Sequence, residues 1–180
     1  MMLMKKIYCL ITVLLLWQST ISNVLANVQF NGNLIDRPCH IKPGSGNQFV
    51  TFKVRGDKDF FTPPGRTPSV NFSITLSNCD KETIGKVVNV IFKGTEEAAL
   101  PGYLAVEGVN KGKLAIGLVD VDGKTLLPIN SFSTQGVLIN NNELLLPFSA
   151  FVQATSDAMT KHDVVPGAYQ AIAQFELQYK

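Results

Sequence analysis

The sequence predicts an all-β domain built as a sandwich of two antiparallel sheets. Stretches rich in β-branched and aromatic residues alternate between apolar and polar positions, which is the pattern of half-buried strands. Turn residues separate these stretches at the short intervals typical of a sandwich. Helical turns are expected only near 95–100 and 156–161, and both stretches are too short to form a layer.

Six stretches carry the strand pattern. They are residues 48–54, 69–79, 85–94, 113–121, 143–154 and 168–179. Turn signals separate them at Pro43-Gly44, residues 62–68, Pro101-Gly102, Asp122-Gly123, residues 140–142 and Pro166-Gly167. The sequence has no internal repeat, low-complexity tract or interdomain linker, so we expect a single folded domain.

The last of these strands runs to the final residue of the sequence. In PGAYQAIAQFELQYK, the residues of one strand face are Tyr169, Ala171, Ala173, Phe175, Leu177 and Tyr179. An immunoglobulin-like sandwich has about seven strands, and its last strand pairs beside the one before it. Residues 168–179 have the character of the penultimate strand, so the predicted fold is an incomplete immunoglobulin-like β-sandwich that lacks its final strand. Such a domain would expose an apolar groove and an open sheet edge.

The N-terminus has the parts of a secretory signal peptide. Two lysines precede an apolar run of eleven residues, 7–17, and Val24-Leu25-Ala26 supplies a cleavage site. We expect residues 1–26 to be removed. A retained membrane anchor is the alternative, but the apolar run is shorter than the roughly twenty residues that span a bilayer. The mature protein is therefore expected not to span a membrane.

The composition of the mature chain narrows its function. Removing 26 of the 180 residues leaves 154, which is enough for one domain with a substantial core. Two of the 16 basic residues leave with the signal peptide, so 14 basic residues balance 14 acidic ones. The sequence shows no basic stripe or aromatic platform, which argues against binding to nucleic acid.

Cysteine usage indicates an oxidising compartment. Cys9 leaves with the signal peptide, and Cys39 and Cys79 remain as an even pair, which favours a disulfide in an exported protein. The disulfide would close a loop of about forty residues, which would stabilise the fold by about 4 kcal/mol. A metal site is the competing interpretation, but two cysteines and two histidines without ligand spacing do not support one.

The sequence offers no catalytic constellation. Neither His40 nor His162 can be placed beside a specific serine, and the G-x-S-x-G motif of a nucleophile elbow is absent. The stretch DVDGKT, residues 120–125, resembles the start of a calcium-binding EF-hand loop, but Ser131 stands where that loop needs an acidic ligand. A hairpin turn at Asp122-Gly123 explains it better. We expect neither an enzyme nor a cofactor.

Residues 27–37 form an N-terminal extension with its own apolar alternation. Val28, Phe30, Gly32 and Leu34 occupy every second position. This segment is either the first strand of its own sheet or an arm donated to another molecule. A donated strand gains main-chain hydrogen bonds along an open edge and places alternate side chains in pockets. Residues 38–180 are then the folded domain.

Several motifs together resemble the pilin subunits assembled by the chaperone–usher pathway of Gram-negative bacteria. They are the signal peptide, the alternating arm, the cysteine pair, Gly167 at the fourteenth position from the end and the penultimate Tyr179. The stretches GNLIDRPCHI, PPGRTP, GKVVNVIFKGTEEAALPGYL and VVPGAYQAIAQFELQYK are similar to those of the adaptor group within this family. The resemblance covers nearly the whole mature chain.

The resemblance implies a pilin domain that is completed by a second molecule. A periplasmic pilus chaperone would lend a strand first, and the arm of a neighbouring pilin subunit would later replace it, with an outer-membrane usher as a further partner. Val28, Phe30, Gly32 and Leu34 would then be donor residues for the preceding subunit. The chaperone or acceptor groove would involve Gly167, Tyr169, Ala171, Ala173, Phe175, Leu177, Tyr179 and Lys180, with the Lys180 carboxylate anchored by basic chaperone residues. Tyr179 has a second interpretation as an ordinary packed ring.

The resemblance implies a noncatalytic, structural minor subunit. Its role would be that of the adaptor that joins the tip fibrillum of a pilus to the pilus rod. It would pass through the periplasm during assembly and end in a fimbrium on the cell surface. Another pilin role, as a rod, tip or terminator subunit, is one alternative. A self-complete secreted β-sandwich that binds a host ligand is the other. A sugar-binding tip adhesin normally needs an additional lectin domain, for which 154 residues leave no space.

Overall fold

The computed structural model describes residues 39–133 and 135–180. The signal peptide, the extension 27–37 with Val28, Phe30, Gly32 and Leu34, and the domain boundary at residue 38 lie outside the described residues. In chain order the described elements are β1 (His40–Ile41), η1 (Asp57–Phe60), β2 (Val70–Ser77), β3 (Val87–Lys93), β4 (Leu104–Ala105), β5 (Glu107–Gly108), β6 (Leu114–Val119), β7 (Leu126–Leu127), β8 (Val137–Leu138), β9 (Leu144–Ala154), α2 (Ser156–Lys161), β10 (Tyr169–Gln170) and β11 (Gln174–Tyr179).

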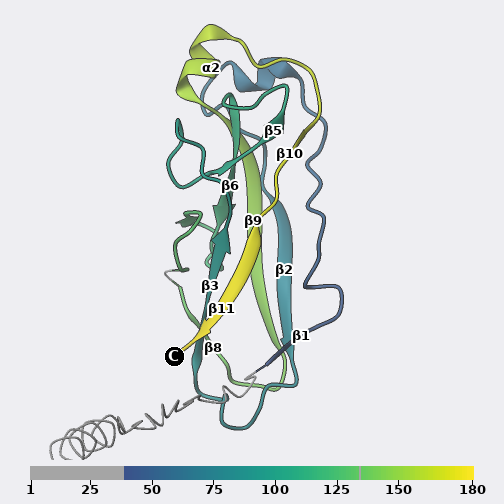
Figure 1. Cartoon of the computed structure of the whole chain (residues 1–180), viewed down its shortest axis with the longest axis vertical. Coiled ribbons are helices and arrows are strands. Elements are labelled where there is room, and N and C mark those ends of the chain that lie inside the picture. Colours follow the sequence, from purple (N-terminus) through teal and green to yellow (C-terminus); the bar gives the residue numbers. More distant parts are fainter. Residues whose placement is uncertain (1–38, 134) are drawn as a thin grey trace, which may run out of the picture. The chain divides into compact units, whose positions relative to one another are not determined.

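The strands form two main antiparallel sheets, as Figure 1 shows. The larger sheet has the order β1-β2-β9-β6-β4, and β7 also pairs with β6. The smaller sheet has the order β11-β3-β8, and β10 pairs separately with β5. Aromatic rings join the two sheets: Phe92 of β3 lies 5.9 Å from Phe72 of β2 and 5.1 Å from Phe148 of β9, measured between ring centroids. The predicted sandwich of two antiparallel sheets is therefore confirmed.

The core between the sheets follows the period of two expected of strands with one buried face. Ile74 and Leu76 of β2 are buried, and so are Leu146 and Phe148 of β9. Val88, Val90 and Phe92 of β3 meet them from the opposite sheet in a single cluster. Complete burial of each such side chain is worth about 1.5–3 kcal/mol.

The predicted disulfide joins Cys39 to Cys79 across a sequence separation of 40. Both cysteines are buried, and they flank the short pairing in which His40 lies opposite Ser77. The bridge thus ties the start of the described chain to the end of β2.

Several predicted elements are present and others differ. The strands expected at 69–79, 85–94, 113–121 and 143–154 are observed as β2, β3, β6 and β9, and the helical turn near 156–161 is α2. The Thr155 hydroxyl oxygen accepts the N–H of Ala158 and so caps this helix. No helix forms at 95–100, where the Gly102 N–H donates to the Glu96 carboxylate and Gly102 itself has a φ of 86°.

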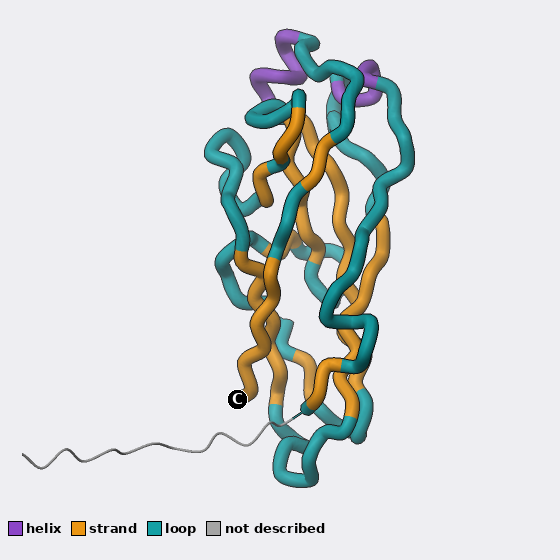
Figure 2. The backbone as a smooth tube through the Cα atoms, turned by 45° about the vertical axis from the view of Figure 1, so that its right-hand side comes forward, coloured by secondary structure: helices purple, strands orange, loops and turns teal. Residues whose placement is uncertain are grey.

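The strand predicted at 48–54 is wrong for the described structure, in which these residues belong to no strand. Figure 2 shows the whole stretch between β1 and η1 as loop. The Gln48 amide donates to the Ser73 carbonyl of β2 with its side chain, and the main chain of 48–54 has no ladder with a described strand. A strand pattern without a neighbouring strand cannot form a ladder, which is the physical reason for the difference.

The strand predicted at 168–179 is divided in two. Its first part, β10, pairs with β5, and its second part, β11, pairs with β3. Residues 171–173 between them belong to neither strand, because the chain changes its partner strand at this point.

Candidate functional site, an apolar groove beside an open sheet edge

Strand β11 has one neighbouring strand among the described residues. It pairs with β3 from Gln174 opposite Lys93 to Tyr179 opposite Val88. Lys180 and Val87 exchange both main-chain hydrogen bonds at 2.9 Å. Because hydrogen-bonded and non-hydrogen-bonded pairs alternate along an antiparallel ladder, the main-chain groups of Phe175, Leu177 and Tyr179 point away from β3. They form an edge that no described strand covers.

An apolar cavity of about 420 Å³ lies inside this edge, and we call it the groove. Its floor comes from both sheets: Phe72, Ile74, Phe92, Leu104, Ile116, Leu118 and Ala150. One wall is the C-terminal stretch Tyr169, Gln170, Ala171, Ile172, Ala173 and Phe175. The other wall is the loop stretch Ser45, Gly46, Gln48, Phe49, Val50 and Phe52. The groove therefore lies between the open edge of β11 and the segment that carries an unused strand pattern.

The most exposed large apolar side chains of the described residues lie on these two walls or directly beside them. Phe49 is 101% exposed and Val54 99% on the loop side, and Ile172 is 82% exposed on the C-terminal side. Apolar side chains gathered beside an open edge are typical of an interaction site.

The predicted groove residues fall into three groups. Tyr169, Ala171, Ala173 and Phe175 line the groove. Leu177 and Tyr179 lie on the same face of β11, where they pack against the core beyond the cavity. Gly167 and Lys180 do not line it: a Cβ at Gly167 would collide with Val109, and exposed Lys180 extends the β11 ladder.

The sequence interpretation missed the groove floor and the opposite wall. The floor residues were identifiable only as alternating core positions of their strands, because nothing in a single sequence says which part of a core is open. The loop wall did have a signal, since Val50 and Phe52 belong to the strand pattern predicted at 48–54.

The groove is electrically neutral. Burial raises the pKa of the Tyr169 hydroxyl and also that of the Tyr179 hydroxyl, so both stay protonated near neutral pH. Charged side chains of β11 and β3 lie outside the groove, where Glu176 of β11 and Lys93 of β3 form an exposed ion pair at 2.6 Å. A neutral apolar groove beside the outward main-chain groups of β11 suits an extended peptide with alternating apolar side chains.

Within 39–133 and 135–180, no group of three or more His, Cys, Asp or Glu side chains has the arrangement of a metal site. Neither described helix has the length and apolar character to cross a bilayer. Asp122 accepts the N–H groups of Lys124 and Thr125, so DVDGKT forms the expected hairpin turn between β6 and β7.

The chain belongs to the family described as fimbrial protein, whose model matches residues 28–180. It is a structural subunit of a fimbrium with an immunoglobulin-like pilin fold. The chain is 51% identical to the fimbrial adapter PapK of Escherichia coli over 87% of this chain and 89% of that protein. It is 50% identical to the Escherichia coli protein PrsK over 86% and 88% of the two chains.

A solved structure supports the fold independently. The crystal structure of the P pilus rod subunit PapA superposes with a TM-score of 0.67 at 22% identity, covering 79% of this chain and 99% of that one.

Proposed function

We propose that this fimbrial subunit is an adaptor, and that its groove receives a β-strand from a second molecule. The adaptor role is supported by the identity of 51% to a protein named as a fimbrial adapter, over most of both chains. The observation that carries the strand-receiving role is the open edge of β11 beside an apolar groove. In this proposal the domain is an immunoglobulin-like sandwich without its final strand.

The incoming strand would lie between β11 and the stretch 48–54. On one side it would bond the outward main-chain groups of Phe175, Leu177 and Tyr179. On the other side it would offer a ladder partner to 48–54, whose strand pattern has none among the described residues. One added strand would thus satisfy two lines of main-chain groups, and its alternate side chains would enter the groove.

The extension 27–37 would serve as the donor toward the groove of the preceding subunit. Val28, Phe30, Gly32 and Leu34 provide the alternation that a groove of this kind accepts, and Gly32 suits a narrow point. The protein would first take a strand from a chaperone in the periplasm and later exchange it for the arm of a neighbouring subunit, with an outer-membrane usher as assembly site. Exchange needs no nucleotide if the second strand buries better-matched side chains.

The proposed role needs no catalytic residue, cofactor or metal. Its chemistry is the burial of apolar surface and the pairing of main-chain groups, both of which the groove and the β11 edge offer. The Lys180 carboxylate would add a charge-assisted anchor for basic chaperone residues at the end of β11.

Copurification from the periplasm tests this function. We expect a chaperone to accompany the secreted chain, and we expect removal of Tyr179 and Lys180 to abolish that complex. Deleting residues 27–35 should leave the chaperone complex intact and abolish joining to the preceding subunit. A self-complete sandwich would behave in the opposite way: the deletion would impair its own folding, and the intact chain would purify as a stable monomer.

A further inference from the structure

The C-terminal wall of the groove is connected to the rest of the fold by a crossover segment, residues 162–168. It leads from α2, which follows β9 of the larger sheet, to β10 and β11 on the other side. The crossover belongs to no strand, and Pro166 within it has no N–H to donate. The N–H groups of His162 and Asp163 bond back to carbonyl oxygens of α2, and at Val165 a side chain supplies the partners.

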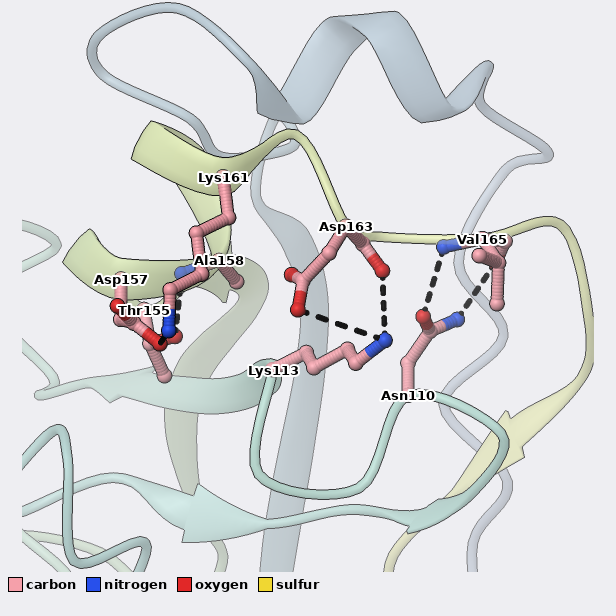
Figure 3. Close-up of polar contacts among 8 residues, drawn as sticks. All are labelled: Asn110, Lys113, Thr155, Asp157, Ala158, Lys161, Asp163 and Val165. Carbon is pink, nitrogen blue, oxygen red and sulfur yellow. Dashed lines mark hydrogen bonds and ion pairs between the residues drawn. The ribbon is translucent and has the colours of Figure 1, made fainter.

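Asn110 holds the middle of the crossover, as Figure 3 shows. Its Nδ2 donates to the Val165 carbonyl oxygen at 2.8 Å, and the Val165 N–H donates to Asn110 Oδ1 at 3.0 Å. The side-chain amide thus takes the place of a neighbouring strand for both main-chain groups of Val165. The Asn110 side chain is only 2% exposed, while Val165 is 43% exposed, so the two hydrogen bonds are partly buried.

The loop that carries Asn110 leads directly into the groove floor. The Asn110 carbonyl oxygen accepts the N–H groups of Lys113 and Leu114, both at 3.0 Å. Leu114 begins β6, and β6 contributes Ile116 and Leu118 to the floor. One residue therefore connects a floor strand with the segment that becomes the wall.

Lys113 of the same loop adds a second attachment. Its Nζ donates to the Asp163 carbonyl oxygen at 2.7 Å and lies 3.6 Å from Asp163 Oδ2. Both contacts are drawn in Figure 3. The Lys113 carbonyl oxygen also accepts the Thr155 N–H, which fixes the loop to the start of α2. The attachment of the crossover is thus built from a loop that is itself held on two sides.

The wall then passes so close to β5 that its position has little tolerance. Tyr169 lies opposite Gly108 and Gln170 opposite Glu107 in a pairing of only two residues. A Cβ at Gly108 would collide with the Ala168 carbonyl oxygen. Further along, a Cβ at Gly94 would lie 3.3 Å from the Ile172 carbonyl oxygen. A small displacement of the crossover would therefore break the short pairing or push the wall into the groove.

We propose that Asn110 is a positioning residue for strand binding: it fixes Val165 so that the wall from Tyr169 to Ala173 keeps its spacing from the floor strand β6. This inference rests on the proposed function, which identifies the occupant of the groove as a β-strand from a second molecule. If the wall is already fixed, less conformational entropy is lost when a strand enters the groove. The strand therefore binds more tightly. Asn110 does not line the groove.

The variant Asn110→Ala tests this role in the full mature chain, residues 27–180. Thr67→Ala is the matched control, because it removes a buried hydroxyl that accepts the Val152 N–H on β9, outside the crossover and the loop that holds it. Hydrogen exchange followed by mass spectrometry measures protection of residues 165–173. A synthetic peptide of residues 27–37, NVQFNGNLIDR, serves as a model strand with the alternation of a donor arm, and its affinity measures strand binding to the groove. Urea unfolding of each variant measures global stability.

We expect Asn110→Ala to speed exchange in 165–173 by about tenfold, the effect of losing two partly buried hydrogen bonds, and to weaken peptide binding several-fold. Thr67→Ala should lower global stability, through the loss of its hydrogen bond with the Val152 N–H, and leave peptide binding unchanged. Equal loss of peptide binding in both variants, or unchanged exchange in 165–173 of Asn110→Ala, would overturn the positioning role.

The isosteric variant Asn110→Asp sharpens the test. It keeps an acceptor for the Val165 N–H but places a carboxylate oxygen against the Val165 carbonyl oxygen at a buried site, so we expect exchange at least as fast as in Asn110→Ala. If the wild-type chain binds neither the peptide nor a chaperone strand, the proposed function fails and the role in strand binding fails with it. The exchange measurement then still decides whether Asn110 holds the wall, so the two failures are distinguishable.

Discussion

Phe52 and Tyr169 approach each other from the two walls of the groove, with ring centroids 6.3 Å apart and planes inclined by 36°. Phe52 comes from the loop wall and Tyr169 from β10, and both rings are half-buried. At this point the walls contact each other directly, whereas β11 further along has an uncovered edge. Burial beside such neighbours is the cause of the raised pKa of Tyr169.

The first prediction concerns this contact. Replacing Phe52 with Ala exposes the Tyr169 ring, so the pKa of its hydroxyl should fall toward the ordinary value of about 10. Absorbance of the tyrosinate ion as a function of pH measures the change. Phe49→Ala, which removes an exposed ring from the same wall, should leave the titration as it is in the wild type.

The second prediction is a loss of stability at high pH. Tyr169 and Tyr179 have a raised pKa in the folded state, so the folded protein binds more protons than the unfolded chain once the pH approaches the unfolded value of about 10. Their contribution is fully present below that pH and is lost as the pH rises through the folded values. The urea midpoint should fall above pH 10, and less steeply in Tyr179→Phe. An equal fall in both proteins would contradict the assignment to Tyr179.

The third prediction tests the aromatic core. Phe92 is buried and contacts Phe72, Phe148 and Phe175, so Phe92→Ala should cost about 3–5 kcal/mol in the free energy of unfolding. Phe49→Ala is the control with the same chemical change on an exposed side chain, and it should stay within about 0.5 kcal/mol. Denaturant unfolding of both variants under the same conditions measures the difference.

The fourth prediction separates backbone strain from collision at two glycines. Gly108 and Gly112 both have positive φ values, 114° and 74°, but a Cβ collides with the main chain only at Gly108. Gly112→Ala should therefore cost about 1–2 kcal/mol from its left-handed backbone alone. Gly108→Ala should cost more and should also increase hydrogen exchange at Tyr169 and Gln170. Equal costs with unchanged exchange would show that β5 and β10 are not in close contact.

The fifth prediction concerns the Cys39–Cys79 bridge. Replacing both cysteines with serine should lower the free energy of unfolding by about 2–5 kcal/mol. Unfolding in the presence and absence of reductant gives the same comparison without substitution. The double variant should no longer respond to reductant, and a remaining response would point to another origin of the effect.

The fold was predictable from the sequence wherever a strand is long and has one buried face. Strands β2, β3, β6 and β9 satisfy that condition, and the turn at Asp122-Gly123 has its own chemical signature. Strands β4, β5, β7 and β8 contain two residues each, too few for an alternation to be recognised. The prediction at 48–54 failed because a strand pattern describes a side-chain preference, while a ladder also needs a neighbour.

The candidate site was predictable only in part. The wall residues Tyr169, Ala171, Ala173 and Phe175 followed from the alternation near the end of the sequence. The role of Asn110 could not be predicted, because its partner Val165 is 55 residues away and asparagine in a loop is ordinary turn chemistry. Contacts of this kind depend on how distant segments are brought together, which no local pattern records.

The pairing of β11 with β3 also affects the order in which the protein folds. Leu177 meets Val90 only after most of the sandwich sequence between them has been made and moved into place. Sheets closed by such distant segments form slowly, and until then the apolar face of β3 is available to any other chain. A binding partner that covers this face early would therefore protect the newly secreted polypeptide. Its binding would have to be faster than aggregation.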